Sequence, residues 1–75
     1  VNVVPGLRSI YRWDGKVCDD QESLLIMKTR ASLMEALTAR ILELHPYDVP
    51  EVISTPVTPG EGNPDYIAWL LEQTA

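Results

Sequence analysis

The stretch His45-Pro46-Tyr47-Asp48-Val49-Pro50-Glu51 decides how this chain is divided. Its two prolines fix two backbone φ angles and push the residue before each of them towards an extended conformation. A helix that precedes the stretch must therefore end at His45. The chain then crosses in a stiff, extended path to a predicted strand, and we call residues 45–51 the joint. Its imidazole, phenol and two carboxylates can serve a ligand, or they can tie down the backbone of a rigid connection.

Residues 32–44, ahead of the joint, show the spacing of an amphipathic helix. Ser32 is the predicted N-cap, and Glu35 three residues later completes a capping box. Apolar side chains then recur at intervals of three and four, which places them on one face of the helix. These side chains are Leu33, Leu37, Ile41 and Leu44.

Residues 8–17 alternate in the manner of a strand, and both of its faces mix polar and apolar groups. This mixture is typical of a strand covered on one side and touched by a partner on the other. Pro5-Gly6 predicts a bend or bulge near the strand's beginning. One face is expected to carry Leu7, Ser9, Tyr11 and Trp13, and the other Arg8, Ile10, Arg12 and Asp14.

Three more elements follow from local patterns. The unbroken apolar run 24–27 predicts a strand buried on both faces, and residues 52–57 predict another strand, with Pro56 indicating a sheet edge. Residues 59–62 predict a flexible loop. Asn63 as N-cap and Pro64 at the first helical position predict a short last helix. The expected order is strand, strand, helix, strand, helix, an α+β chain.

The bulk composition narrows the class of protein. A chain of 75 residues is predicted to form one domain, residues 1–75, and a core of this size supplies only about 3–5 kcal/mol of stability. Cys18 is the single cysteine, which excludes a disulfide within the chain and suits a reducing, cytoplasmic compartment. Oligomerisation is therefore the expected source of further stability. The net charge of −5 argues against a nucleic-acid partner, and no apolar run is long enough for a membrane span.

Several motifs of the chain, in order and spacing, resemble the CutA family of divalent-cation-tolerance proteins. The joint resembles that family's signature His-Pro-Tyr-x-Val-Pro-Glu, residues 1–6 followed by 9–16 its long second strand, 24–29 its third strand, and 66–70 its closing helix. The resemblance covers the family's C-terminal two-thirds, and the first strand and helix that precede Val1 in the family are expected to be absent here. It implies a ferredoxin-like, PII-like sandwich that assembles as a homotrimer through its long hairpin.

The resemblance also decides two structural expectations. Asp14-Gly15 alone would suit a two-residue hairpin turn, but the resemblance places the turn later, in the acidic residues 19–22. It further implies that the strands at 24–29 and 52–57 flank an empty lane. Since unpaired backbone groups each cost about 1–3 kcal/mol when buried, we expect the lane either to close as a right-handed βαβ unit or to take a strand from a neighbouring subunit. We favour closure, which gives an antiparallel hairpin, a βαβ unit and a C-terminal helix.

His45 and Glu51 are the candidate metal ligands. Imidazole nitrogen and carboxylate oxygen both bind copper and zinc, and the resemblance implies copper ligation at these positions together with a cysteine that precedes Val1. Cys18 lies elsewhere in the sequence and does not inherit that role. The alternative is that His45 only ends the helix and that Pro46, Tyr47 and Pro50 are structural. We therefore expect no required cofactor, with copper or another divalent cation as a possible ligand.

The remaining candidates concern assembly. Tyr11 and Trp13 on one strand face, and Trp69 in the last helix, are predicted oligomer-interface residues. The sequence contains no glycine-rich phosphate loop, no nucleophile elbow and no paired histidines, so we expect a protein that is not an enzyme. Two functions follow: a homo-oligomeric divalent-cation-tolerance protein that binds a divalent metal, or an oligomeric PII-like sensing or scaffolding module without a metal site. A trimer is the expected assembly, with a dimer or a strand-swapped assembly as the alternative.

Overall fold

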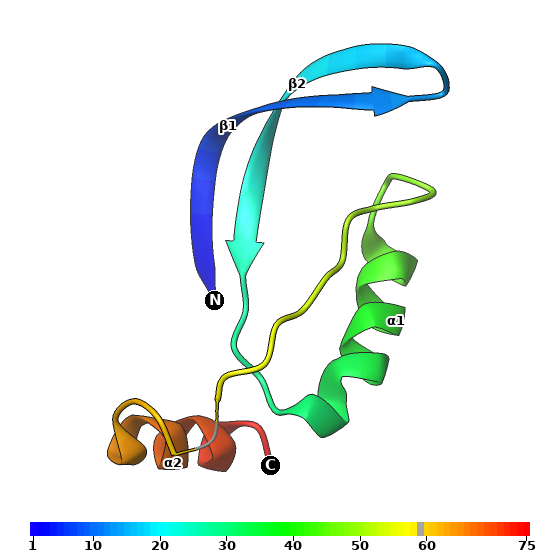
Figure 1. Cartoon of the computed structure of the whole chain (residues 1–75). Helices are drawn as coiled ribbons and strands as arrows, with labels where there is room; N and C mark the ends of the chain where they lie inside the picture. The colour runs from blue at the N-terminus through cyan, green and yellow to red at the C-terminus, as the bar shows by residue number, and fades with distance from the viewer. Residues whose placement is uncertain (59) are drawn as a thin grey trace.

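The computed structural model describes residues 1–58 and 60–75 and has an α+β architecture. Strands β1 (Asn2–Trp13) and β2 (Lys16–Ile26) form a two-stranded antiparallel sheet. A 3₁₀ turn, η1 (Ala31–Leu33), leads into helix α1 (Met34–Leu44), and helix α2 (Pro64–Gln73) closes the chain. Figure 1 shows a long, curved hairpin, with α1 and α2 as separate arms below it. Pro59, the first residue of the predicted loop 59–62, lies outside the described residues.

The hairpin carries the predicted bulge. The register pairs Val4 with Leu24 and then Leu7 with Glu22, so the ladder shifts at Pro5-Gly6. Gly6 has a φ of 73°, which a residue with a side chain rarely adopts. The alternation beyond the bulge is also confirmed, because the cross-strand partners place Tyr11 opposite Cys18 and Trp13 opposite Lys16.

The turn of the hairpin lies at Asp14-Gly15, and the prediction of a turn at residues 19–22 was wrong. Asp14 and Gly15 have φ values of 52° and 73°, the left-handed pair that a two-residue hairpin turn needs to match the twist of its strands. Residues 19–22 instead lie within β2. Cross-strand partners hold the acidic side chains there, since Asp19 accepts two hydrogen bonds from Arg8 and Asp20 accepts one from Tyr11.

The end of α1 and the start of α2 confirm the sequence predictions, whereas the start of α1 does not. His45 is the C-cap of α1, with φ −75° and ψ 137°, as the following proline demands. Asn63 caps α2 by accepting a hydrogen bond of 3.0 Å from the Asp65 amide. The prediction of a capping box at Ser32 was wrong, because residues 31–33 form a 3₁₀ turn and α1 begins without a side-chain cap.

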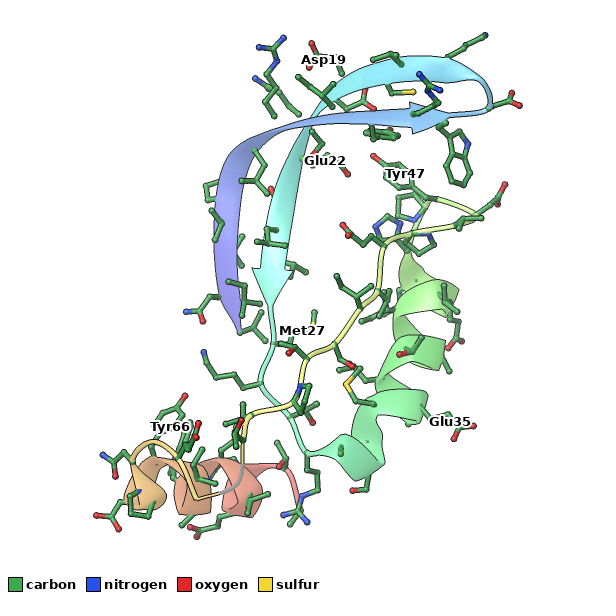
Figure 2. All side chains as sticks on the ribbon, viewed as in Figure 1. Asp19, Glu22, Met27, Glu35, Tyr47 and Tyr66 are labelled. Atoms are coloured by element: carbon green, nitrogen blue, oxygen red, sulfur yellow. The ribbon has the colours of Figure 1, made fainter. Side chains whose placement is uncertain are left out.

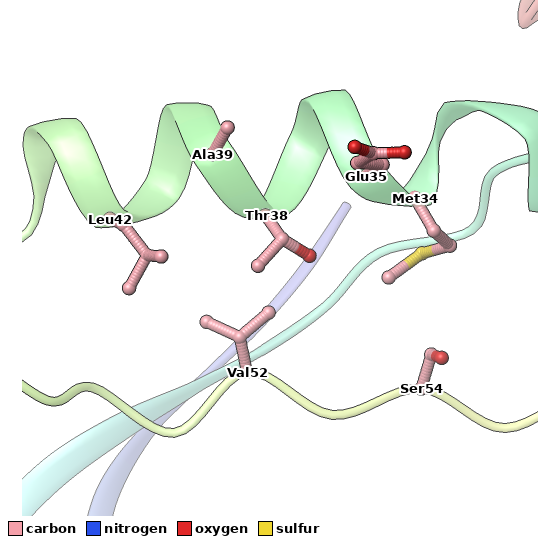
Figure 3. A pocket seen from close by; sticks show the side chains of 7 residues that line it. All are labelled: Met34, Glu35, Thr38, Ala39, Leu42, Val52 and Ser54. Carbon is pink, nitrogen blue, oxygen red and sulfur yellow. The ribbon is translucent and has the colours of Figure 1, made fainter.

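Residues 51–58 form neither a strand nor a helix, so the predicted strand at 52–57 and the predicted right-handed βαβ unit were wrong. Among the described residues, the backbone of this segment makes no hydrogen bond to β2. Figure 1 shows it running as a yellow trace back from the joint between α1 and the hairpin. The joint and the packing of Val52 towards α1 set this course (Figure 3). Within the described residues the sheet has only the two strands β1 and β2, and this segment is not paired with either.

No residue in the described part of the chain is buried. Leu24, Leu25 and Ile26, predicted to be buried on both faces of their strand, expose 43%, 50% and 44% of their surface. This prediction was wrong for the single chain, because the lane beside β2 holds no other strand of the described residues. The radius of gyration is 15.4 Å, against about 11 Å for a compact domain of this length.

Candidate functional site

The joint is held by a hydrogen bond between its own first and third residues. His45 is extended, and Pro46 has no N–H, so the Tyr47 amide is the first backbone donor after the helix. That amide donates to Nδ1 of His45 at 3.1 Å. The two rings also lie against each other, with centroids 4.7 Å apart and planes tilted by 58°. Figure 2 shows the Tyr47 ring pointing from the joint towards the hairpin.

This bond fixes the chemistry of the imidazole. A ring nitrogen that accepts a hydrogen bond uses its lone pair and carries no proton, so the proton of the neutral ring lies on Nε2. His45 therefore presents an acceptor to its own backbone and an N–H donor to its surroundings. Its half-buried position at the end of α1 holds the ring beside the joint.

Within the described residues, His45 and Glu51 are not joined by a hydrogen bond or an ion pair. Glu51 is exposed, and within the described residues its carboxylate makes no hydrogen bond or ion pair, with His45 or any other group. Those residues also contain no cluster of three or more His, Cys, Asp and Glu side chains that could hold a metal. Structural zinc takes four ligands and catalytic zinc three. Two separate candidates, one of which uses its Nδ1 lone pair elsewhere, do not fit such a centre in this arrangement.

The inner face of the hairpin carries the first aromatic pair. Tyr11 and Trp13 share this face with Asp20 and Glu22, as the register requires, and Figure 2 shows Glu22 on the side towards the joint and Asp19 on the opposite side. The Tyr11 hydroxyl donates to Asp20 Oδ2 at 2.6 Å. This bond, followed by desolvation and the nearby negative charges, raises the pKa of the Tyr11 phenol well above its ordinary value. Trp13 remains 53% exposed.

The outer face carries a charge pair that the sequence did not predict. The Arg8 guanidinium donates through Nε and Nη2 to the two carboxylate oxygens of Asp19, at 2.9 and 2.7 Å. The hydrogen bonds lower the pKa of Asp19 and raise that of Arg8. The alternation of β1 and β2 could have suggested this diagonal pair once the turn was placed at Asp14-Gly15.

Trp69 lies in α2, where its ring centroid is 5.7 Å from that of Tyr66. Both rings are exposed. The helix is tied to the rest of the chain through Arg30, which precedes η1. Its Nη2 donates to the carbonyl of Leu71, and its Nε donates to Thr74 Oγ1 at 3.4 Å. The sequence does not predict this contact between a cationic side chain and the end of a helix, because 41 residues separate Arg30 from Leu71.

An open groove runs between α1 and the segment after the joint (Figure 3). Val52 and Ser54 form one wall, and the helix forms the other with Met34, Glu35, Thr38, Ala39 and Leu42. The lining is mostly apolar and brings no catalytic pair together. The groove therefore offers a packing surface rather than a reaction site.

A curved hairpin, two helices and the joint between α1 and residues 51–58 define a small α+β chain whose apolar faces are exposed. A sequence profile of the family described as "CutA1 divalent ion tolerance protein" matches residues 1–73, and the chain belongs to this family. It is 51% identical over 74 residues to the divalent-cation tolerance protein CutA of Thermus thermophilus. The match covers 99% of this chain and 70% of that protein. The chloroplastic protein CutA of Arabidopsis thaliana is 53% identical over 74 residues, 40% of its length.

Solved structures give the same relation. The divalent cation tolerance protein of Thermus thermophilus superposes with a TM-score of 0.91 at 50% identity, over 99% of this chain and 70% of that chain. CutA1 from Oryza sativa superposes with a TM-score of 0.91 at 51% identity, over 99% of this chain and 66% of that chain. The described fold thus matches about two thirds of each of these solved CutA1 chains. Within the described residues, no helix is long and apolar enough to cross a membrane.

Proposed function

We propose that this chain acts as a non-enzymatic, homo-oligomeric member of the divalent-cation-tolerance family, with a trimer as its assembly. One observation carries the proposal: none of the described residues is buried, while apolar side chains are exposed on the hairpin, on α1 and on α2. A chain in this state lacks the core that normally offsets conformational entropy. Copies of the same chain are the expected cover for these faces.

The exposed area supports assembly with other copies, and two interfaces of standard size per chain, as in a trimer, match it. The chain exposes 6727 Å², whereas a compact monomer of 8.4 kDa would expose about 4,600 Å², so the excess is roughly 2,100 Å². A standard interface covers about 800 Å² on each partner. One such interface, as in a dimer, leaves more than half of the excess uncovered. Two interfaces, as in a cyclic trimer, cover most of it.

The hairpin and α2 supply the proposed interface. Tyr11, Trp13 and Trp69 are large aromatic side chains that the single chain leaves exposed, and such side chains are enriched at the centres of interfaces. The unpaired lane between β2 and residues 51–58 adds an edge on which a strand of another copy can pair, which would complete a ferredoxin-like, PII-like sheet. The net charge of −5 favours a protein partner over nucleic acid.

Cation binding at His45 and Glu51 is the second candidate function. The exposed Glu51 carboxylate, which has no partner among the described residues, favours it, and relatives carry the name divalent-cation tolerance protein. Copper or another divalent cation is the proposed ligand, with further ligands from a neighbouring copy, since two are too few. No cofactor is required for the assembly itself. The free Cys18 thiol suits a reducing compartment such as the cytoplasm.

Light scattering on the full chain, with and without copper, tests the proposal. We expect a particle of three times the chain mass of 8.4 kDa that does not depend on the metal. Trp13→Ser should shift the population towards smaller species, because it removes an aromatic anchor from the inner face. The matched control is Ile10→Ser, a somewhat more exposed apolar residue on the outer face of β1. A folded, compact monomer at all concentrations would contradict the assembly, and dissociation by Ile10→Ser alone would contradict the choice of face.

A further inference from the structure

We infer that Nδ1 of His45 is the hydrogen-bond acceptor for the Tyr47 amide, and that His45 cannot bind a divalent cation while this bond is intact. We call the joint closed when the bond is present and open when it is broken. The inference rests on the cation-binding candidate above for its second half, but its first half stands on the geometry alone. The Tyr47 amide donates to Nδ1 of His45, and the two rings lie against each other at a tilt of 58°. The closed joint and a cation therefore compete for one side chain.

The competition follows from the single lone pair of a neutral imidazole. If His45 offers Nδ1 to a cation, the Tyr47 amide loses its acceptor. If His45 offers Nε2, the Nε2 proton must leave and a proton must return at Nδ1, so the ring gains and loses one proton. Nδ1 then becomes an N–H that faces the N–H of Tyr47, and the hydrogen bond is again lost. Either mode of ligation opens the joint.

The sequence explains why the hydrogen bond from the Tyr47 amide forms at His45. The proline after His45 removes the nearest amide, and His45 itself is held extended, so the ring can fold back on the next N–H. The arrangement resembles an Asx turn, in which a side-chain oxygen accepts from the amide two residues later. An ordinary hydrogen bond of this kind should lower the affinity of His45 for a cation about two- to tenfold. By linkage, a bound cation opens the joint by the same factor.

Nitrogen NMR on the full chain without metal tests the first half. In the neutral form of the His45 ring we expect the proton on Nε2, together with a Tyr47 amide protected from exchange. His45→Asn should keep this protection, because the amide oxygen of asparagine can replace Nδ1 as acceptor, whereas His45→Ala should lose it. A ring with its proton on Nδ1, or equal protection in both variants, would overturn the inference.

Zinc ions, which are diamagnetic, test the second half on the same samples. Binding of zinc to wild-type chain should remove the protection of the Tyr47 amide, and Tyr47→Pro, which lacks the N–H, should bind zinc two- to tenfold more tightly. Tyr47→Phe keeps the amide and should bind like wild type. Zinc bound to His45 with the Tyr47 amide still protected would overturn the inference. If neither wild type nor Tyr47→Pro binds zinc, the cation-binding candidate fails, and the ring tautomer alone decides the role of His45.

Discussion

Individual side-chain hydrogen bonds determine much of the local geometry of this molecule, because no described residue is buried. The Tyr11 hydroxyl, the Asp19 carboxylate and His45 Nδ1 each find one strong partner within the chain. Two of these bonds use an ionised group, and such bonds are shorter and stronger than neutral ones. They lie on exposed surface, so they fix geometry and register more than they stabilise the fold.

The Tyr11–Asp20 bond predicts a measurable pH dependence. Asp20→Ala should lower the pKa of the Tyr11 phenol towards its ordinary value of 10.0, because the acceptor and its negative charge are the main causes of the rise. Since the folded-state pKa lies above the unfolded one, the stabilisation is complete below pH 10 and is lost as the pH rises through the folded value. Tyrosinate absorbance against pH, with Tyr11→Phe to identify the signal, measures the shift.

The matched control for this titration is Asp19→Ala. Asp19 is the neighbour of Asp20 in β2, but it lies on the outer face and bonds Arg8. Its removal should leave the Tyr11 titration in place. An equal fall of the Tyr11 pKa in both variants would show that general negative charge, rather than the bond to Asp20, causes the rise.

At the scale of elements, local rules predicted those features that local chemistry decides. The end of α1 at His45, the Asn63 cap and the bulge at Pro5-Gly6 each depend on residues a few positions apart. The turn was misplaced because the resemblance outweighed Asp14-Gly15, whose own backbone preference was the better guide. The strand at 52–57 failed for another reason. A strand needs a partner edge, and sequence pattern does not show whether one is within reach.

The candidate site divides in the same way. The sequence predicted the end of α1 and the extended conformation of His45 correctly, since Pro46 determines both, but residues 46–49 bend rather than continue in the expected extended path. It could not predict that the ring of His45 turns back on the Tyr47 amide, because that depends on a side-chain rotation. The tie between Arg30 and the end of α2 was also missed, since it joins residues far apart in the sequence.

That tie predicts the behaviour of α2. Arg30→Ala should fray the last turn of the helix, because it removes a cationic donor from the C-terminal carbonyls and costs about 1–2 kcal/mol locally. Amide hydrogen exchange of residues in the last turn of α2 is the measurement, and Arg30→Lys, which keeps the charge without the two-pronged geometry, is the control. Unchanged exchange in the alanine variant would mean that other contacts hold the helix.

At the scale of the whole molecule, folding and assembly are expected to be one process. The described residues form no buried core, so in the proposed assembly most of the apolar burial would come from contacts between chains. In such proteins the thermal midpoint depends on protein concentration by mass action. The number of chains in the assembly sets the size of that dependence.

The dependence can therefore count the chains. When a trimer unfolds to three monomers, each tenfold dilution lowers the stability by roughly 0.9 kcal/mol per subunit, against about 0.7 for a dimer and none for a monomer. For a chain of this length, 0.9 kcal/mol corresponds to a fall of about 4–7 °C in the thermal midpoint. Circular dichroism melts over a hundredfold range of concentration measure it, with Trp13→Ser as a variant that should melt lower at every concentration. A thermal midpoint that does not change on dilution would show that the chain folds alone. The exposed faces would then need a different partner.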